Sequence, residues 1–298
     1  MSSAFSHTPV LIEPTLAALA PSSGGLYVDA TVGGGGHAAR ILEASAPDAR
    51  LIAFDRDPDA LEAARGRLGP FGDRVTFVHA PFSRVSEVLA DLELEQIDGL
   101  LADLGVSSPQ LDRAERGFSF ARSGPLDMRM DPTQGETALE LLGRVEESEL
   151  ADILFQFGEE RRSRRVARAI LAALGAGELE TTDDLRRVVG RAFGPRRSRI
   201  DPSTRTFQAL RIAVNRELEE LDALLVSLED VLADGAVAAI ISFHSLEDRR
   251  VKWAFRQSES LSPLFKKPVI AGPEEREDNP RARSAKLRAA RRVPRGEA

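Results

Sequence analysis

The sequence predicts an α/β fold built on a Rossmann-like, doubly wound parallel sheet that is interrupted by an inserted all-helical domain. Three observations lead to this prediction. Short apolar runs alternate with helical patterns through the first hundred residues, four consecutive glycines follow the first run, and another apolar run appears near residue 240 after a long stretch of helical pattern. Strands that alternate with helices pair in parallel through right-handed crossovers. Consecutive glycines cost backbone entropy, so their position indicates that the backbone there must stay bare.

Five apolar runs have the length and composition of buried strands. They cover residues 26–31, 50–55, 74–80, 97–105 and 235–243. The first four are separated by the segments HAARILEA, PDALEAARGRL and FSRVSEVLADL, each about as long as a crossover helix. Because an open α/β sheet binds its ligand beyond the carboxyl ends of its strands, the residues that follow each strand are the candidates for the site.

The middle of the chain has a different character. Residues 106–135 are rich in Gly, Pro, Ser and Asp and indicate a structured loop, and only helical patterns follow them. One helix face is formed by Leu150, Ile153, Leu154 and Phe157. Further on, Thr181 and Asp184 form a capping box. We therefore expect an α/β domain over 1–108 and 215–298, with a helical domain over 109–214 inserted into it.

Charge is distributed unevenly along the chain, although the net charge is −7. Residues 161–216 contain 14 Arg, no Lys and five acidic residues, and residues 281–295 contain seven basic residues and no acidic one. Two basic segments on an acidic body indicate a polyanion bound at particular places, and the preference for arginine favours phosphate contacts. Solvated helix faces are the alternative for either segment. The second segment also alternates through Ala285, Leu287 and Ala289, which favours an edge strand whose basic face could touch RNA.

Composition excludes several classes of protein. The balance of 42% hydrophobic and 29% charged residues is typical of a globular chain rather than a disordered one. The absence of cysteine excludes disulfides, thiolate catalysis and cysteine-based zinc sites. No apolar run approaches the ~20 residues that cross a bilayer, and the start does not resemble a signal peptide, so we expect a cytoplasmic protein without a membrane partner. His7, His79 and His244 lack metal-ligand spacing, so no metal is expected.

The glycine loop follows the first strand, and residues 33–38, GGGGHA, match a G-x-G-x-x-A pattern. Asp55 lies 20 residues beyond Gly35, at the end of the second strand, where a carboxylate can accept hydrogen bonds from two ribose hydroxyls. The pattern fits an NAD enzyme as well as an enzyme with another nucleoside cofactor. A helix N-cap is the alternative role for Asp55, but Asp57 before Pro58 suits that role better.

Other side chains follow the later strands. Phe82 comes after the third strand and either packs on a purine or belongs to the core. Asp103 ends the fourth strand beside a flexible glycine, where a carboxylate can hold a cationic group or accept a proton from an amine. His37 either borders the ligand or only begins a helix.

The segment SFHSLEDRR at 242–250 follows the fifth strand. His244 would lie on the ligand-facing edge of the sheet and could contact a substrate base. The local pattern also has an explanation without function, because Ser245 with Asp248 would cap the next helix.

At LLADLGVSSPQLDRAERGFSFARSGPLDMRMDP (100–132) the chain closely resembles the RsmH/MraW family of bacterial S-adenosylmethionine-dependent methyltransferases. These enzymes modify N4 of a cytidine in 16S ribosomal RNA of the small subunit. The resemblance runs nearly end to end, through HTPVLIEP, DATVGGGGH, FDRDPDAL, FGEERRSRRVARAI, TRTFQALRIAVNRELEEL, SFHSLEDRRVK and NPRARSAKLR. It implies a class I methyltransferase fold whose helical insertion recognises the substrate, 16S rRNA in the assembled small subunit.

The resemblance also implies a set of cofactor-binding residues. They are Gly35, Gly36 and His37 around the methionine part of S-adenosylmethionine, Asp55 at the ribose, Phe82 near the adenine, and Asp103 and Gln110 on the side of the fourth strand. Many other amino-methyltransferases carry an Asp/Asn-Pro-Pro-aromatic motif after this strand. This chain has Asp103-Leu-Gly-Val instead, so the amine must be recognised differently.

Methyl transfer from a sulfonium is an in-line displacement to which a protein contributes mainly by alignment. Cytosine N4 is a poor nucleophile because its lone pair is delocalised into the ring. We expect Asp103, or a carbonyl in the turn 103–107, to accept an N4 proton, and the base to leave its stack to reach the cofactor. Two other functions stay open on the residues alone: an NAD-linked oxidoreductase, which leaves the arginine-rich insertion unused, and a ribosome-assembly factor that keeps the fold without turnover.

Overall fold

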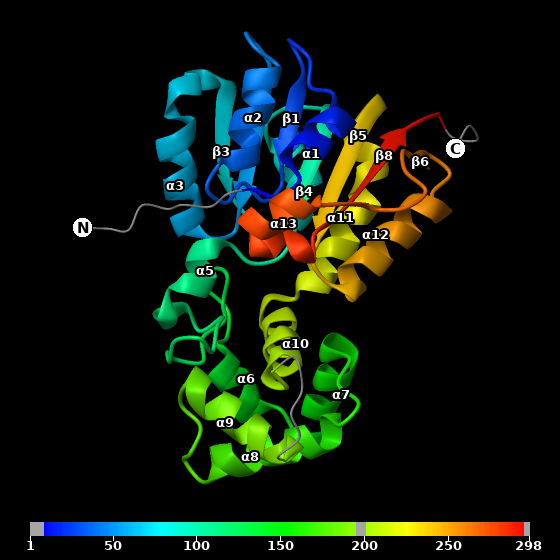
Figure 1. Ribbon diagram of the computed structural model, residues 1–298. Coiled ribbons are helices and arrows are strands. Elements are labelled where there is room, and N and C mark those ends of the chain that lie inside the picture. Colours follow the sequence, from blue (N-terminus) through cyan, green and yellow to red (C-terminus); the bar gives the residue numbers. More distant parts are fainter. Residues whose placement is uncertain (1–8, 195–200, 295–298) are drawn as a thin grey trace. The chain divides into compact units, whose positions relative to one another are not determined.

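The computed structural model describes residues 9–194 and 201–294 (Figure 1). The chain forms two compact units, the first from 1–105 and 218–298 and the second from 106–217. The domain boundaries expected above, at 108/109 and 214/215, lie within three residues of these. Several residues singled out in the sequence lie outside the described part: His7, Arg196, Arg197, Arg199 and Arg295.

The first unit is built on an eight-stranded sheet with the order β3-β2-β1-β4-β5-β8-β6, and β7 pairs with β8. The strands are β1 (Leu26–Asp29), β2 (Arg50–Asp55), β3 (Val75–His79), β4 (Ile97–Asp103), β5 (Leu232–Ser242), β6 (Leu261–Pro263), β7 (Val269–Ile270) and β8 (Lys286–Arg292). Strands β1 to β5 pair in parallel, and β8 runs antiparallel to β5. The order reverses between β1 and β4, which is where open α/β sheets bind their ligands.

Helices cover both faces of this sheet. One face carries α1 (Ile12–Leu19), α2 (Gly36–Ala44) and α3 (Pro58–Leu68), and the other carries α4 (Val85–Asp91), α11 (Glu217–Val231) and α12 (Ser245–Gln257). The strand residues alternate between the two layers, so that Leu51 and Ala53 join the first while Ile52 and Phe54 join the second. This burial on both faces explains why the strands are continuous apolar runs. The first unit therefore has the predicted Rossmann-like arrangement.

Short elements complete the first unit. They are the 3₁₀ turns η1 (Gly69–Arg74), η2 (Phe82–Arg84) and η4 (Pro280–Arg283), and the helix α13 (Pro273–Asp278). Within the described residues of both units, no helix combines the length and the apolar character that crossing a bilayer requires.

The second unit is helical around its own apolar core. It contains α5 (Ser108–Asp112), η3 (Ala114–Arg116), α6 (Ala138–Arg144), α7 (Glu147–Gly158), α8 (Ser163–Gly175), α9 (Thr182–Phe193) and α10 (Ser203–Asn215). The predicted helix face is confirmed, since Leu150 and Leu154 are fully buried in that core and Ile153 and Phe157 pack against it. The predicted capping box is also present, because the Thr181 hydroxyl accepts a hydrogen bond from the Asp184 N–H while Asp184 accepts one from the Thr181 N–H.

The predicted strands are confirmed, but three local predictions need correction. The tail forms the strand β8, which is not an edge strand because it lies between β5 and β6. The loop over 106–135 is not wholly irregular, because Ser107 and Gln110 form a capping box that begins α5. The N-cap of α12 is His244 rather than Ser245, and its partner is Glu247 rather than Asp248. Glu247 is buried and accepts hydrogen bonds from two backbone N–H groups ahead of the helix. Asp248 points instead to β8, where it pairs with Lys286 and Arg288.

Candidate cofactor site

The glycine loop leads from the end of β1 into α2 with a backbone that few side chains would permit. Gly35 adopts a left-handed conformation, with φ of 75°, as the N-cap of α2. A Cβ on Gly36 would lie 2.2 Å from the ring of Pro9, so the loop is bare partly because another segment of chain lies against it. Gly35 and Gly36 therefore have structural reasons for their identity, and the loop leaves its peptide groups close to the switch point of the sheet.

Asp55 connects this loop to the end of β2. Its two carboxylate oxygens accept hydrogen bonds from the N–H groups of Gly33 and Asp57, each at 2.9 Å. Asp57 in turn caps α3 by accepting from the Asp59 N–H, as predicted. Burial raises the pKa of Asp55 to about 6, although the two backbone donors act in the opposite direction. A carboxylate held this way keeps lone pairs available for hydroxyl donors of a ligand.

Asp103 ends β4 in the neighbourhood of His37 from the first turn of α2. The His37 Nε2 atom lies 3.8 Å from Asp103 Oδ2, and both side chains are largely shielded from solvent. The backbone N–H of Asp103 donates to the Thr31 hydroxyl at 2.6 Å, but its Oδ1 has no hydrogen-bond partner. Burial, followed by the negative charges of Asp29 and Glu247, raises the pKa of Asp103 well above its usual value. The structure thus brings together two of the residues that the resemblance implied.

Asp29 is a candidate site residue that we did not identify from the sequence. It ends β1, is 1% exposed, and uses one carboxylate oxygen to accept from the Thr31 N–H, while the other has no partner. Burial raises its pKa to about 7, and the charge of Asp55 adds to this effect. Its signal was present in the sequence, because it closes the first strand just as Asp55 and Asp103 close the second and fourth.

Asp29, Asp55 and Asp103, which we call the acid cluster, lie at the carboxyl ends of three adjacent strands. Their raised pKa values have burial as the first cause; the charge of Asp55 adds to the shift of Asp29, and that of Asp29 adds to the shift of Asp103. Buried carboxylate oxygens without partners are unfavourable unless a cation or a hydrogen-bond donor reaches them. The acid cluster beside the glycine loop is therefore suited to a ligand that carries positive charge and hydroxyl groups.

The remaining predicted residues have other local explanations. Phe82 begins η2 and is a half-buried ring packed against the core on the α4 side of the sheet. Gln110 belongs to the second unit, is buried, and uses its Oε1 atom to accept from the Ser107 N–H at 2.9 Å. His244 accepts from the Glu247 N–H through Nδ1 as the cap of α12. A ligand role for Phe82 and Gln110 stays a prediction.

Replacing Asp29 by Asn tests whether the pKa of this carboxyl is raised in the folded protein. A carboxyl whose folded pKa lies near 7 instead of 3.8 destabilises the folded state progressively as pH rises through that interval. We therefore compare the free energy of unfolding of Asp29→Asn with that of the unmodified protein, both without cofactor. The difference should rise in favour of the variant by up to about 4 kcal/mol between about pH 4 and pH 7, and it should stay constant above pH 7. Chemical denaturation across this range measures it.

Asp48→Asn is the matched control with the opposite sign. The Asp48 carboxylate accepts hydrogen bonds from Ser23 and Gly24, which lower its pKa, so its contribution to stability is present above pH 4 and lost below. A relative stability of Asp29→Asn that does not change with pH would contradict the assignment.

Comparisons with known proteins find similarity along almost the whole chain. A family model described as the MraW methylase family matches residues 4–293. A protein named ribosomal RNA small subunit methyltransferase H from Sorangium cellulosum is 61% identical over 293 residues, which cover 98% of this chain and 92% of the relative. The protein of the same name from a Synechococcus strain is 53% identical and is covered over 98% of its length.

The fold is also similar to that of a SAM-dependent O-methyltransferase from Thermotoga maritima. The TM-score is 0.45 and the identity 11%, over 98% of this chain and 69% of the other, which is too remote to inform the function. The family match and the two sequence relatives each span nearly the full length. The chain accordingly belongs to the MraW methylase family.

Proposed function

We propose that this protein transfers a methyl group to the exocyclic N4 amine of a specific cytidine in 16S ribosomal RNA. Membership of the methylase family, and relatives named for methylation of small-subunit ribosomal RNA, support the reaction class. S-adenosylmethionine is the methyl donor. The observation that carries the proposal is the acid cluster beside the bare glycine loop, since a donor with an ammonium group, a sulfonium group and a ribose diol matches it.

The residues divide the recognition of the donor among themselves. Asp55, already fastened by two backbone donors, holds the ribose hydroxyls with its remaining lone pairs. Asp29 and Asp103 each have a carboxylate oxygen without a partner, and these oxygens face the positive charges of the donor. Gly35, Gly36 and His37 border the methionine part, Phe82 lies near the adenine, and Gln110 is the remaining cofactor-binding residue that the resemblance implies. Binding of a cation lowers the pKa values of the three carboxyl groups of the acid cluster and so favours their ionised form.

Asp103 also acts on the substrate amine, as the hydrogen-bond acceptor for N4–H. Bound S-adenosylmethionine would supply an electrophilic methyl group to N4, in line with the C–S bond that breaks, and its sulfur would leave as a neutral thioether. The N4 lone pair is delocalised into the cytosine ring, so a hydrogen bond from N4–H to the Asp103 carboxylate helps to localise it. No stronger base is required, because the methylated nitrogen loses its proton easily.

The second unit supplies the contacts to the RNA backbone. Among its arginines, Arg161, Arg164 and Arg165 are exposed and have no ion-pair partner in the described part of the chain. Others are already paired: Arg168 with Glu147, Arg186 with Asp201 and Arg187 with Asp184. Arg162 stacks on the Phe193 ring. The three unpaired arginines are the best placed to neutralise phosphates while the first unit receives the flipped base.

The direct test uses ribosomal RNA from cells that lack this protein. Mass spectrometry should find one methyl group missing from a single cytidine, and purified protein with labelled S-adenosylmethionine should restore it. We expect the assembled small subunit, in the cytoplasm, to be the better substrate than free RNA. Normal methylation of every cytidine in the deficient cells, or tight NADH binding without a response to S-adenosylhomocysteine, would exclude the proposal.

Asp103→Asn tests the role of this carboxylate in the methyl transfer step. The amide keeps the shape but is a weaker acceptor, so kcat should fall by about 100-fold or more. Single-turnover transfer to undermethylated small subunits measures the step, and calorimetry with S-adenosylhomocysteine checks that the cofactor still binds. Asp91→Asn, on an exposed residue of α4, is the control. Near-normal turnover with intact cofactor binding would assign the acceptor to a backbone carbonyl instead.

Charge neutralisation in the second unit tests the RNA contacts. The triple variant Arg161→Gln, Arg164→Gln and Arg165→Gln should reduce the slope of log affinity against log salt by about 2, if each arginine neutralises one phosphate of a single strand. The matched triple variant at Arg168, Arg186 and Arg187 should change the slope much less, because acidic partners already neutralise those arginines. Filter binding at several salt concentrations distinguishes the two, and equal slopes would rule out this group.

A further inference from the structure

The outer face of α12 combines positive charge with an exposed tryptophan. The helix buries Leu246, Val251 and Phe255 against the sheet. Arg249, Lys252, Trp253 and Arg256 follow the spacing i, i+3, i+4, i+7 that places residues on one helix face, and Lys252 and Arg256 lie at its edge toward β8. This face contains no acidic residue.

Trp253 is the only tryptophan of the chain, and its side chain is 47% exposed. Tryptophan is highly buried on average, so leaving this ring in water is unfavourable unless a partner covers it. Lys252 Nζ lies 5.1 Å from the ring centroid, which places a cation beside the exposed aromatic surface. The position therefore indicates a contact surface rather than a core residue.

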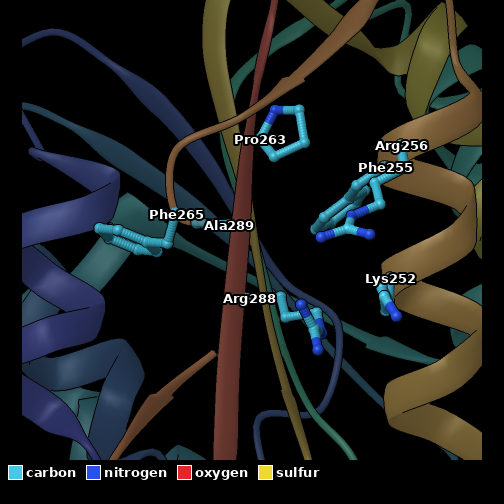
Figure 2. Close-up of a pocket in the computed structure, with 7 residues that line it drawn as sticks. All are labelled: Lys252, Phe255, Arg256, Pro263, Phe265, Arg288 and Ala289. Atoms are coloured by element: carbon cyan, nitrogen blue, oxygen red, sulfur yellow. The ribbon is translucent and has the colours of Figure 1, made fainter. Parts of the chain in front are cut away.

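A second exposed ring lies next to this helix face. Phe265, in the loop after β6, lines a hollow together with Lys252 and Arg256, and Figure 2 shows this hollow between α12 and β8. The hollow holds no more than about one water molecule, so a partner must lie across the surface rather than inside it. Lys266 and Lys267 follow Phe265 directly and are exposed.

The cations of this surface differ from those of β8. Lys286 and Arg288 of β8 share Asp248, and Arg292 approaches Asp234 at 3.7 Å, so three cations of the basic tail have acidic neighbours within the fold. Within the described residues, Lys252, Arg256, Lys266 and Lys267 have no acidic partner. These four cations of α12 and the loop after β6 are therefore available to a partner, in a chain whose net charge is −7.

We infer that the α12 surface, formed by Lys252, Trp253, Arg256, Phe265, Lys266 and Lys267, binds single-stranded RNA by stacking bases on its rings and neutralising phosphates with its cations. Exposed aromatic rings among unpaired cations are what sequence-tolerant single-strand binding requires. A protein partner fits less well, because lysine is depleted in protein interfaces. The inference rests on the proposed function, which supplies an RNA partner, and adds a second contact region in the first unit.

The position of the surface supports a role beside the acid cluster. Glu247, in the first turn of α12, is close enough to Asp103 to raise the pKa of that carboxyl. Trp253 follows six residues later, about 9 Å along the helix axis. Nucleotides that flank a flipped base therefore come within reach of the α12 surface.

The single tryptophan makes the test direct. The full chain is titrated with an oligocytidylate of about 12 nucleotides and with protein-free 16S rRNA, while Trp253 fluorescence is recorded. Stacking should quench the emission. Trp253→Ala should weaken binding of labelled RNA at least about fivefold, Trp253→Phe should recover most of the loss, and the double variant Lys252→Gln with Arg256→Gln should lower the salt slope.

The control double variant is Arg40→Gln with Arg144→Gln, because both arginines are exposed but paired with glutamates. Cofactor binding by calorimetry verifies that every variant is folded. Unchanged fluorescence with RNA and unchanged affinity in Trp253→Ala overturn the inference. A fluorescence change with assembled small subunits but not with protein-free rRNA also overturns it, and points to a ribosomal protein.

Methyl transfer by the unmodified protein separates this inference from the proposed function. If the unmodified protein transfers methyl groups normally and the Trp253→Ala variant binds RNA normally, the inference about the α12 surface is wrong and the proposed function stands. If the unmodified protein transfers no methyl group but RNA quenches its Trp253 fluorescence, the proposed function is wrong and RNA binding by the α12 surface is supported.

Discussion

The hydrogen bond between the Gly33 N–H and the Asp55 carboxylate is the interaction on which the site depends. It fastens the glycine loop after β1 to the end of β2, while the second carboxylate oxygen holds the turn into α3 through the Asp57 N–H. One side chain therefore positions the starts of two crossover helices at the switch point of the sheet. The left-handed backbone at Gly35 and the Pro9 ring against Gly36 shape the same loop without any ligand.

This arrangement places carboxyl groups in shielded positions, where a negative charge is unfavourable. Asp29, Asp55 and Asp103 all end strands and are all shielded, and Glu247 adds a further charge near Asp103. Carboxyl groups in such surroundings hold their protons more tightly, and a cationic ligand reverses the effect. In the proposed function, the stability lost by burying the acid cluster is the counterpart of its affinity for a positively charged methyl donor.

The two units use arginine in different ways. In the second unit, Arg168, Arg186 and Arg187 pair with acidic residues, and only some arginines remain available for phosphate. In the first unit, Lys286 and Arg288 of β8 pair with Asp248, while Lys252 and Arg256 of α12 have no acidic partner among the described residues and lie in a region with two exposed rings. Counts of charge along the sequence therefore overstate the surface that RNA can meet, and they also miss the region where aromatic rings and unpaired cations coincide.

The sequence by itself determined the strands of the parallel sheet, the helices between them, the resumption of the sheet at β5 and the place of Asp55 and Asp103 at strand ends. Hydrophobic periodicity, glycine and capping residues act over a few neighbouring positions, so they can be recognised along the chain. Only the tertiary structure decided that Asp29 joins the acid cluster, that Glu247 rather than Asp248 caps α12, and that Trp253 is exposed. These properties depend on which distant segments meet, as when Asp248 pairs with Arg288 forty residues away, and no local pattern encodes such a distance.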